Sequence, residues 1–232
     1  MSEPIIAVFT HTGLIPATYI EACVAATQVA LTRDFAPLWS GAQLIYVAPG
    51  GTIQPEWWQA TFFDHSDQAD ALGYHDLTSS GQPLAKIFAA DCIADHENWN
   101  VTFSHEIWEM LADPRIDKTV TYDGWEYAQE VADAPEDDRY GQRVNDHLIS
   151  NAVTPAWFEP NGKPPFTMYP CDAISAPFAL AYGGYIGRRH LPNGEWEQQL
   201  AAQRGPRQIK GPRSRTMRRF HATGPILAGP TP

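Results

Sequence analysis

The sequence has 232 residues, of which 44% are hydrophobic and 12% aromatic, which suits one domain with a sizeable core and excludes a disordered chain. No apolar run approaches the roughly 20 residues of a membrane-spanning helix, so a membrane protein is not expected. The first residues do not resemble a signal peptide, and three scattered cysteines form no CxxC pair. These features predict a cytoplasmic protein with reduced thiols.

The net charge of −11 is unevenly distributed along the chain. Residues 1–187 contain 7 Lys and Arg against 25 Asp and Glu, a net charge of −18, whereas residues 188–232 contain 9 against 2, a net charge of +7. We therefore expect an acidic domain over 1–187 and a basic, extended tail over 188–232. The tail is expected to dock on the acidic body or on a neighbouring subunit of a homo-oligomer. Nucleic-acid binding is not expected, because the acidic body opposes it and no base-reading motif is visible.

Alternating strand and helix patterns fill the first part of the chain. Apolar, β-branched residues predict strands over 4–11 and 42–49, and apolar residues spaced by three and four predict a helix over 17–33 between them. Aromatic residues in 50–70 indicate packing beneath a loop. Two further strands, LGYHDL and LAKIFAA, are expected on either side of a turn at 79–81.

The segment TFSHEIWEMLADP, residues 102–114, predicts an amphipathic helix with a chemically suggestive polar side. Residues four apart lie on one face of a helix, so His105 and Glu109 project together, and Asp113 lies one turn further on. Glu106 can flank the same pocket. A cap from Thr102 or Ser104 is expected to begin the helix, and Pro114 to end it. The apolar residues that face the core are Phe103, Ile107, Met110 and Leu111.

This polar side contains the residue types of a hydrolytic metal site. HExxH on a helix provides two zinc ligands and a general base, and here a glutamate replaces the second histidine. A carboxylate is also a metal ligand, so the pattern predicts His105 and Glu109 as ligands and Glu106 as the base. The alternative is an ordinary solvated helix face.

The segment resembles the active-site helix of zincin-type metallopeptidases in an HExxE form. The order of strand, helix, strand and edge strand (LAKIFAA) before the helix is also similar to the zincin N-terminal half. In the gluzincin branch a glutamate on a second downstream helix is the third ligand, which implies this role for Glu130 within EYAQEVAD. The resemblance also implies that Asp133 is an outer-shell partner of His105, and we place Asp113 in the same outer shell. SHEIWEMLADP and EVADAPEDDRY further resemble a family of uncharacterised bacterial proteins.

Together these patterns predict an α+β, zincin-like fold with a mixed sheet, an active-site helix, a loop-rich C-terminal half and a basic tail. The segment 125–135 is expected as a short second helix or an extended piece, 136–175 as loops, and 176–187 as a strand. His75 is expected to be a structural or surface residue.

The function expected from these patterns is metal-dependent hydrolysis of a peptide or protein. Zinc is the expected metal, with Mn, Fe or Ca as alternatives, because one histidine and two carboxylates form a hard, anionic ligand set. The alternative function is that of a non-catalytic structural or assembly protein that uses its basic tail for subunit contacts.

Overall fold

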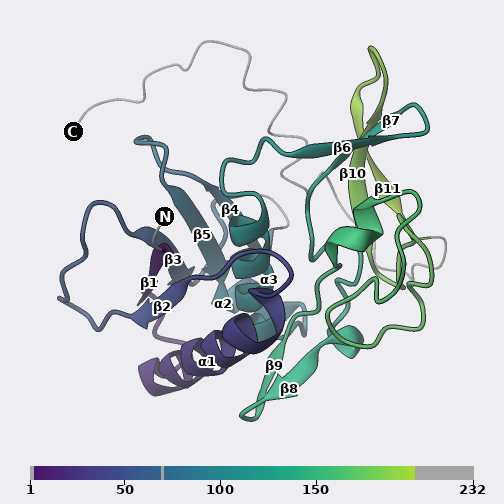
Figure 1. Ribbon diagram of the computed structural model, residues 1–232. Coiled ribbons are helices and arrows are strands. Elements are labelled where there is room, and N and C mark those ends of the chain that lie inside the picture. The colour runs from purple at the N-terminus through teal and green to yellow at the C-terminus, as the bar shows by residue number, and fades with distance from the viewer. Residues whose placement is uncertain (1–2, 69–70, 202–232) are drawn as a thin grey trace.

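The N-terminal half of the protein contains a five-stranded sheet (Figure 1). In this computed structural model, which describes residues 3–68 and 71–201, the strands are β1 (Ile5–Thr10), β2 (Gln43–Tyr46), β3 (Trp58–Phe63), β4 (Gly73–Leu77) and β5 (Pro83–Phe88). The strand order is β2-β1-β3-β5-β4. β4 runs antiparallel to β5, whereas the other neighbouring pairs are parallel.

The first strands and the first helix confirm the expected pattern. Helix α1 (Ala17–Ala30) connects the parallel strands β1 and β2, and a π-helical turn at Leu31–Phe35 extends it. The stripe spaced by three and four is buried as predicted: Ile20, Cys23, Val24, Thr27, Ala30 and Leu31. Burial of this stripe fixes α1 on the core.

Strand β3 was not expected from the sequence. The aromatic cluster predicted to pack under a loop contains Trp58, Phe62 and Phe63, which belong to β3, between β1 and β5. Phe62 is fully buried and packs against Phe103. Ala60 and Phe62 on one face are buried, whereas Phe63 on the other face is half-buried, so apolar residues occur on both faces and the segment lacks strict alternation.

The two strands predicted around residues 79–81 form the β4–β5 hairpin, but the strand at the edge of the sheet is not the predicted one. LAKIFAA was expected at the edge of the sheet, and this is wrong: β5 is an inner strand paired with β3 and β4. The terminal strand is β4, so the residues of GYHDL line this edge. Sequence patterns describe a strand's faces and not its neighbours, so they could not rank the two.

Helix α3 (Trp99–Ala112) follows the short helix α2 (Ala89–Ala94) and contains the HExxE segment. It begins earlier than expected, because the side chain of Asn98 accepts a hydrogen bond from the Asn100 N–H as the cap. It ends before Pro114, as predicted. α3 packs on β4 and β5 on one side and on β9 (His147–Ile149) on another.

The C-terminal half contains more strand than expected. A second sheet has the order β11-β10-β7-β6, and a separate hairpin pairs β8 (Gln142–Val144) with β9. The bounds in the second sheet are β6 (Thr119–Tyr122), β7 (Trp125–Ala128), β10 (Tyr185–His190) and β11 (Trp196–Leu200). Two 3-10 turns lie at Asp138–Tyr140 and Pro155–Phe158. The protein is therefore of the α+β class.

Two sequence boundaries differ from this arrangement. The strand expected over 176–187 is mostly irregular, and only its last three residues belong to β10. β10 continues across residue 187, where the acidic domain was expected to end, and β11 follows it. The remaining basic segment, 202–232, lies outside the described residues, as does its expected role in subunit contacts.

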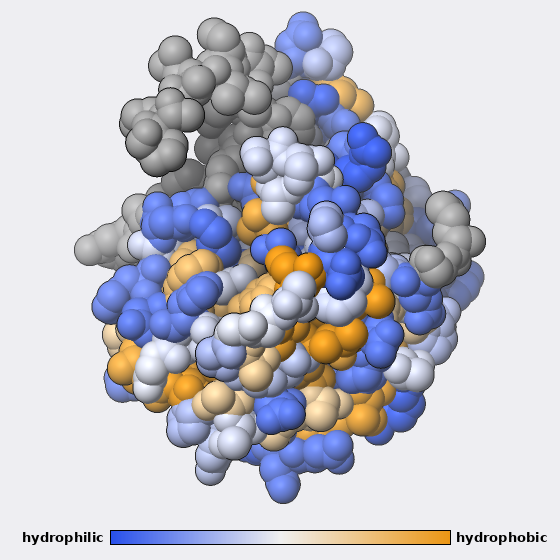
Figure 2. All heavy atoms as spheres, turned by 90° about the vertical axis from the view of Figure 1, so that its left-hand side faces the viewer, coloured by the Kyte–Doolittle hydropathy of each residue, from blue (hydrophilic) through white to orange (hydrophobic). Residues whose placement is uncertain are grey.

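The described surface is mainly polar with scattered apolar side chains. Figure 2 shows hydrophobic residues interspersed among hydrophilic ones on the face that it presents. The exposed large apolar residues are Leu14, Tyr19, Val29, Ile93, Tyr122 and Leu200, which come from separate regions of the chain. None of the described helices combines the length and the apolar character that crossing a membrane requires.

Trp108 holds α3 to the rest of the core. Its ring is fully buried and stacks on Phe35 with centroids 4.6 Å apart, and its indole N–H donates to the Ser150 carbonyl at 3.0 Å. Ser150 N–H in turn donates to Ser104 Oγ at 2.8 Å. Trp108 thus joins the end of α1, the middle of α3 and the chain after β9.

We expect Trp108→Ala to lower the free energy of unfolding by about 3–5 kcal/mol, because it leaves a large cavity and an unsatisfied buried carbonyl. Denaturant unfolding followed by circular dichroism measures this change. Tyr19→Ala, at an exposed position, is the control and should change stability by less than about 0.5 kcal/mol. A loss below about 1 kcal/mol for Trp108→Ala would contradict this account of the core.

Candidate metal centre

The polar side of α3 faces the interior and not solvent. The side chains of His105, Glu106 and Glu109 are 10%, 5% and 2% exposed. The solvated helix face, the alternative considered from the sequence, is therefore not what the fold provides. Ionisable groups at this depth need compensation from neighbouring side chains or ions.

Part of this environment comes from the loop after β7. Residues 130–135 are all buried in an irregular segment, so Glu130 and Asp133 do not lie on a second helix as the resemblance implied. Extended pairing of β7 in the second sheet replaces that helix. Segment 130–135 is held by backbone bonds, in which Val153 N–H donates to the Val131 carbonyl at 2.7 Å and Tyr185 N–H to the Asp133 carbonyl at 3.1 Å.

The start of β10 allows this loop to lie close. A Cβ placed on Gly184 would be 2.0 Å from the Ala134 carbonyl oxygen, a distance no side chain tolerates. Because Gly184 has no side chain, the second sheet can pack closely against segment 130–135.

The closest group of potential ligands consists of His105, Glu109 and Asp133. His105 Nε2 lies 3.2 Å from Glu109 Oε1 and 3.3 Å from Asp133 Oδ1. One donor atom from each of the three residues lies within 4.8 Å of the others. In this structure the His105 ring nitrogen can share a hydrogen bond with either carboxylate. Ligands at about 2.0–2.1 Å around a tetrahedral zinc are separated by about 3.3 Å, so the same two distances also allow these donors to share one cation.

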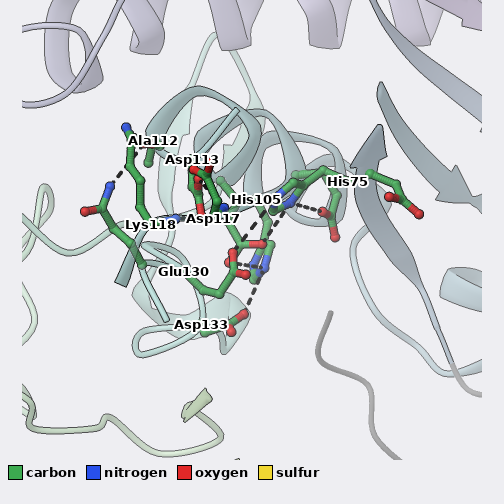
Figure 3. Close-up of polar contacts among 12 residues, drawn as sticks. His75, His105, Ala112, Asp113, Asp117, Lys118, Glu130 and Asp133 are labelled. Atoms are coloured by element: carbon green, nitrogen blue, oxygen red, sulfur yellow. Dashed lines mark hydrogen bonds and ion pairs between the residues drawn. The ribbon is translucent and has the colours of Figure 1, made fainter. Parts of the chain in front are cut away.

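A second histidine, His75, enters the same cluster from β4 (Figure 3). His75 Nδ1 lies 3.5 Å from Glu109 Oε2 and 3.7 Å from Glu106 Oε2. The expectation of a surface or structural position missed this contact, and His75 is only 1% exposed. The available signal was the alternation in GYHDL, which puts Gly73 and His75 on one face, but the pattern does not show that α3 covers that face.

Gly73 explains how β4 comes so close to α3. A Cβ at Gly73 would lie 2.7 Å from Thr102 Cγ2 and 3.0 Å from Glu106 Oε1. The Glu106 carboxylate therefore rests against bare strand backbone. The same close approach brings His75, two residues further along the strand, to Glu106 and Glu109.

The remaining predicted residues occupy different places. Glu130 reaches the cluster from the far side of His75, with Oε2 3.9 Å from His75 Nε2. Asp113 points to the other end of α3 (Figure 3), where its carboxylate accepts the backbone N–H groups of Asp117 and Lys118, both at 3.1 Å. The structure thus brings together His105, Glu106, Glu109, Glu130 and Asp133, and places Asp113 in a loop-closing role.

Burial and neighbouring charges together shift the pKa values of the cluster. Burial by itself would lower the pKa of His105, but the Glu109 and Asp133 carboxylates outweigh it and raise this pKa well above its usual value. Burial, and then the negative charge of Asp133, raise the pKa of Glu109 well above its ordinary range. Burial and the Asp133 charge also raise the pKa of Tyr185, which keeps this phenol protonated. The cluster therefore attracts positive charge.

Comparisons with protein-family models, with curated proteins and with solved structures find no match to this chain. The functional argument therefore depends on the site itself.

In metal-free protein, we expect the free energy of unfolding to fall as the pH rises from about 5 to about 8. Folding raises the pKa values of both His105 and Glu109. At a pH above the ordinary pKa of each group, the unfolded chain has lost the proton, whereas the folded protein still holds it. Each such proton contributes a slope of up to about 1.4 kcal/mol per pH unit. Urea unfolding in chelator at several pH values measures this slope.

The double variant His105→Gln, Glu109→Gln removes both titrating groups and should show a flatter pH dependence over the same range. Equal slopes for the double variant and the wild type would contradict this assignment of the titrating groups.

Proposed function

We propose that the protein is a metal-dependent hydrolase with a zincin-like arrangement, in which His105, Glu109 and Asp133 bind a divalent cation. The observation that carries the proposal is the spacing of these donors, with His105 Nε2 3.2 Å from a Glu109 oxygen and 3.3 Å from an Asp133 oxygen. Relative to the ligand set implied by the zincin resemblance, Asp133 takes the position given to Glu130, and Glu130 supports the cluster through His75.

Charge supports a cation as the occupant. Four carboxylates, from Glu106, Glu109, Glu130 and Asp133, are buried around two imidazoles. Buried carboxylates are costly unless they are protonated, paired or bound to metal, and the raised pKa of Glu109 reflects this cost. A divalent cation would lower the cost directly. One imidazole and two carboxylates suit zinc, with manganese and iron(II) as the alternatives.

Glu106 is the proposed general base. A bound cation would acidify a water molecule and polarise a substrate carbonyl. Glu106 follows His105 directly on α3, and its carboxylate lies at the cluster and against Gly73. It would accept a proton from the water and transfer it to the leaving group. This role needs a carboxylate that is not fully neutralised by its neighbours.

The terminal position of β4 supports a peptide-like substrate. β4 ends the five-stranded sheet, and its His75 belongs to the cluster. A terminal strand can pair with an extended peptide through backbone hydrogen bonds. Such pairing along β4, in place of the β5 pairing suggested by the sequence, would lead the peptide past Glu106.

One observation favours a second function, that of a non-catalytic protein with a structural cation. No side chain of the cluster is more than 10% exposed, and closed sites are typical of structural metals. His105 is the most exposed member, so its end of the cluster is the expected point of entry for water and substrate.

We expect the purified protein to retain zinc through dialysis, and Asp133→Ala to lower its zinc affinity by at least about tenfold, because a ligand is removed. Calorimetric titration of metal-free protein with Zn²⁺ measures both affinities. Asp172→Ala changes an exposed aspartate and should bind like the wild type. A wild type that binds no divalent metal would contradict the proposed site.

We expect Glu106→Gln to keep the cation held by His105, Glu109 and Asp133 but to cleave a quenched-fluorescent peptide library about 10²–10⁴-fold more slowly, because the proton acceptor is lost. Glu21→Gln, on the exposed side of α1, should cleave at the wild-type rate. Equal turnover by Glu106→Gln and the wild type would exclude Glu106 as the base. Metal binding without cleavage by the wild type would favour the structural function.

A further inference from the structure

The two oxygens of Glu109 face different histidines. Oε1 lies 3.2 Å from His105 Nε2, and Oε2 lies 3.5 Å from His75 Nδ1. His105 belongs to α3 and His75 to β4, so the Glu109 carboxylate lies between two imidazoles that come from different elements (Figure 3). A carboxylate in this position can bind one cation through each oxygen.

His75, Glu106 and Glu109 form a second set of donors. One atom from each of the three lies within 4.8 Å of the others, and all three side chains are buried. His75 Nδ1 lies 3.5 Å from Glu109 Oε2 and 3.7 Å from Glu106 Oε2. These distances exceed the roughly 2.7–3.2 Å of an N–H···O hydrogen bond, and they suit two ligands that share one metal ion.

The charge of the whole cluster also favours a second cation. One divalent cation at His105, Glu109 and Asp133 would offset two of the four buried carboxylates. The remaining negative charge would lie on the side of the cluster toward β4, around His75, which reaches Glu106 through Nδ1 and Glu130 through Nε2. A second divalent cation there would balance it. Two-metal hydrolases hold their ions about 3.5–4 Å apart, a separation that one carboxylate can bridge.

We infer that His75, Glu106 and Glu109 bind a second divalent cation, and that Glu109 bridges the two cation sites. The inference rests on the proposed function, because it shares Glu109 with the site described above. A carboxylate that binds a cation through one oxygen keeps lone pairs on the other, so Glu106 can bind here and still accept a proton.

Counting bound metal ions tests the inference without any assay of activity. Metal-free protein is titrated with Zn²⁺ by calorimetry, and zinc per chain is measured by elemental analysis after the excess is removed. We expect two zinc ions for the wild type, one for His75→Ala and one for Asp133→Ala. Glu109→Ala should lose both tightly bound ions, because both sites share this residue.

His65→Ala is the matched control, because His65 is an exposed histidine outside the cluster and the variant should keep two zinc ions. The zinc that His75→Ala retains also reports that its fold is intact. His75→Asn, which fills more of the buried space, is the second variant and should also bind one. With Mn²⁺ in place of Zn²⁺, the electron paramagnetic resonance spectrum of the wild type should show two coupled ions, and that of His75→Asn one uncoupled ion.

The outcomes separate this inference from the proposed function. One zinc ion in the wild type, unchanged in both His75 variants and lost in Asp133→Ala, would overturn the second site and leave the first intact. Two zinc ions retained by both His75 variants would place the second ion elsewhere and also overturn the inference. A wild type that binds none would overturn both sites together.

Discussion

Folding of this chain requires that an acidic helix face be removed from water. α3 is the most deeply buried helix in the described part of the fold, and its side toward β4 and segment 130–135 bears His105, Glu106 and Glu109. Burying such groups is unfavourable unless other groups compensate them. The groups beside this face come from distant parts of the sequence: His75 on β4 brings an imidazole to Glu106 and Glu109, and Asp133 after β7 brings a carboxylate to His105. The tertiary fold and the candidate site are therefore inseparable.

Two glycines allow neighbouring elements around the cluster to pack closely. Gly73 lets β4 lie against Thr102 and Glu106, and Gly184 lets β10 lie against the Ala134 carbonyl. Hydrogen bonds from Val153 and Tyr185 hold the loop that carries Asp133. Donors mounted on a strand, a helix and a tightly bonded loop are held in place more firmly than donors on mobile loops, which is what a metal site requires.

The same arrangement links metal binding to stability. Burial and then the Asp133 charge raise the pKa of Glu109, and the Glu109 and Asp133 carboxylates raise that of His105 against burial, so both groups favour their protonated forms in the folded protein. A cation would take the place of these protons, and its binding free energy would add to the stability of the folded state. A hydrolase and a structural metal protein would share this linkage. What separates them chemically is Glu106, because a purely structural site needs no proton acceptor beside its ligands.

Local patterns in the sequence determined β1, α1, β2, the β4–β5 hairpin, the HExxE helix and the residues His105, Glu106 and Glu109 as neighbours, since helical and strand periodicity act over a few residues. They missed the central strand β3, assigned the edge position to LAKIFAA and not to β4, and left segment 125–135 open between helix and extended chain, because these features depend on which distant segment packs alongside. The resemblance placed Asp133 beside His105, as the structure does, but tertiary structure alone brought His75 to Glu109 and turned Asp113 away. No local period encodes the distance between residues 75, 109 and 133; burial of the sheet and of α3 sets it.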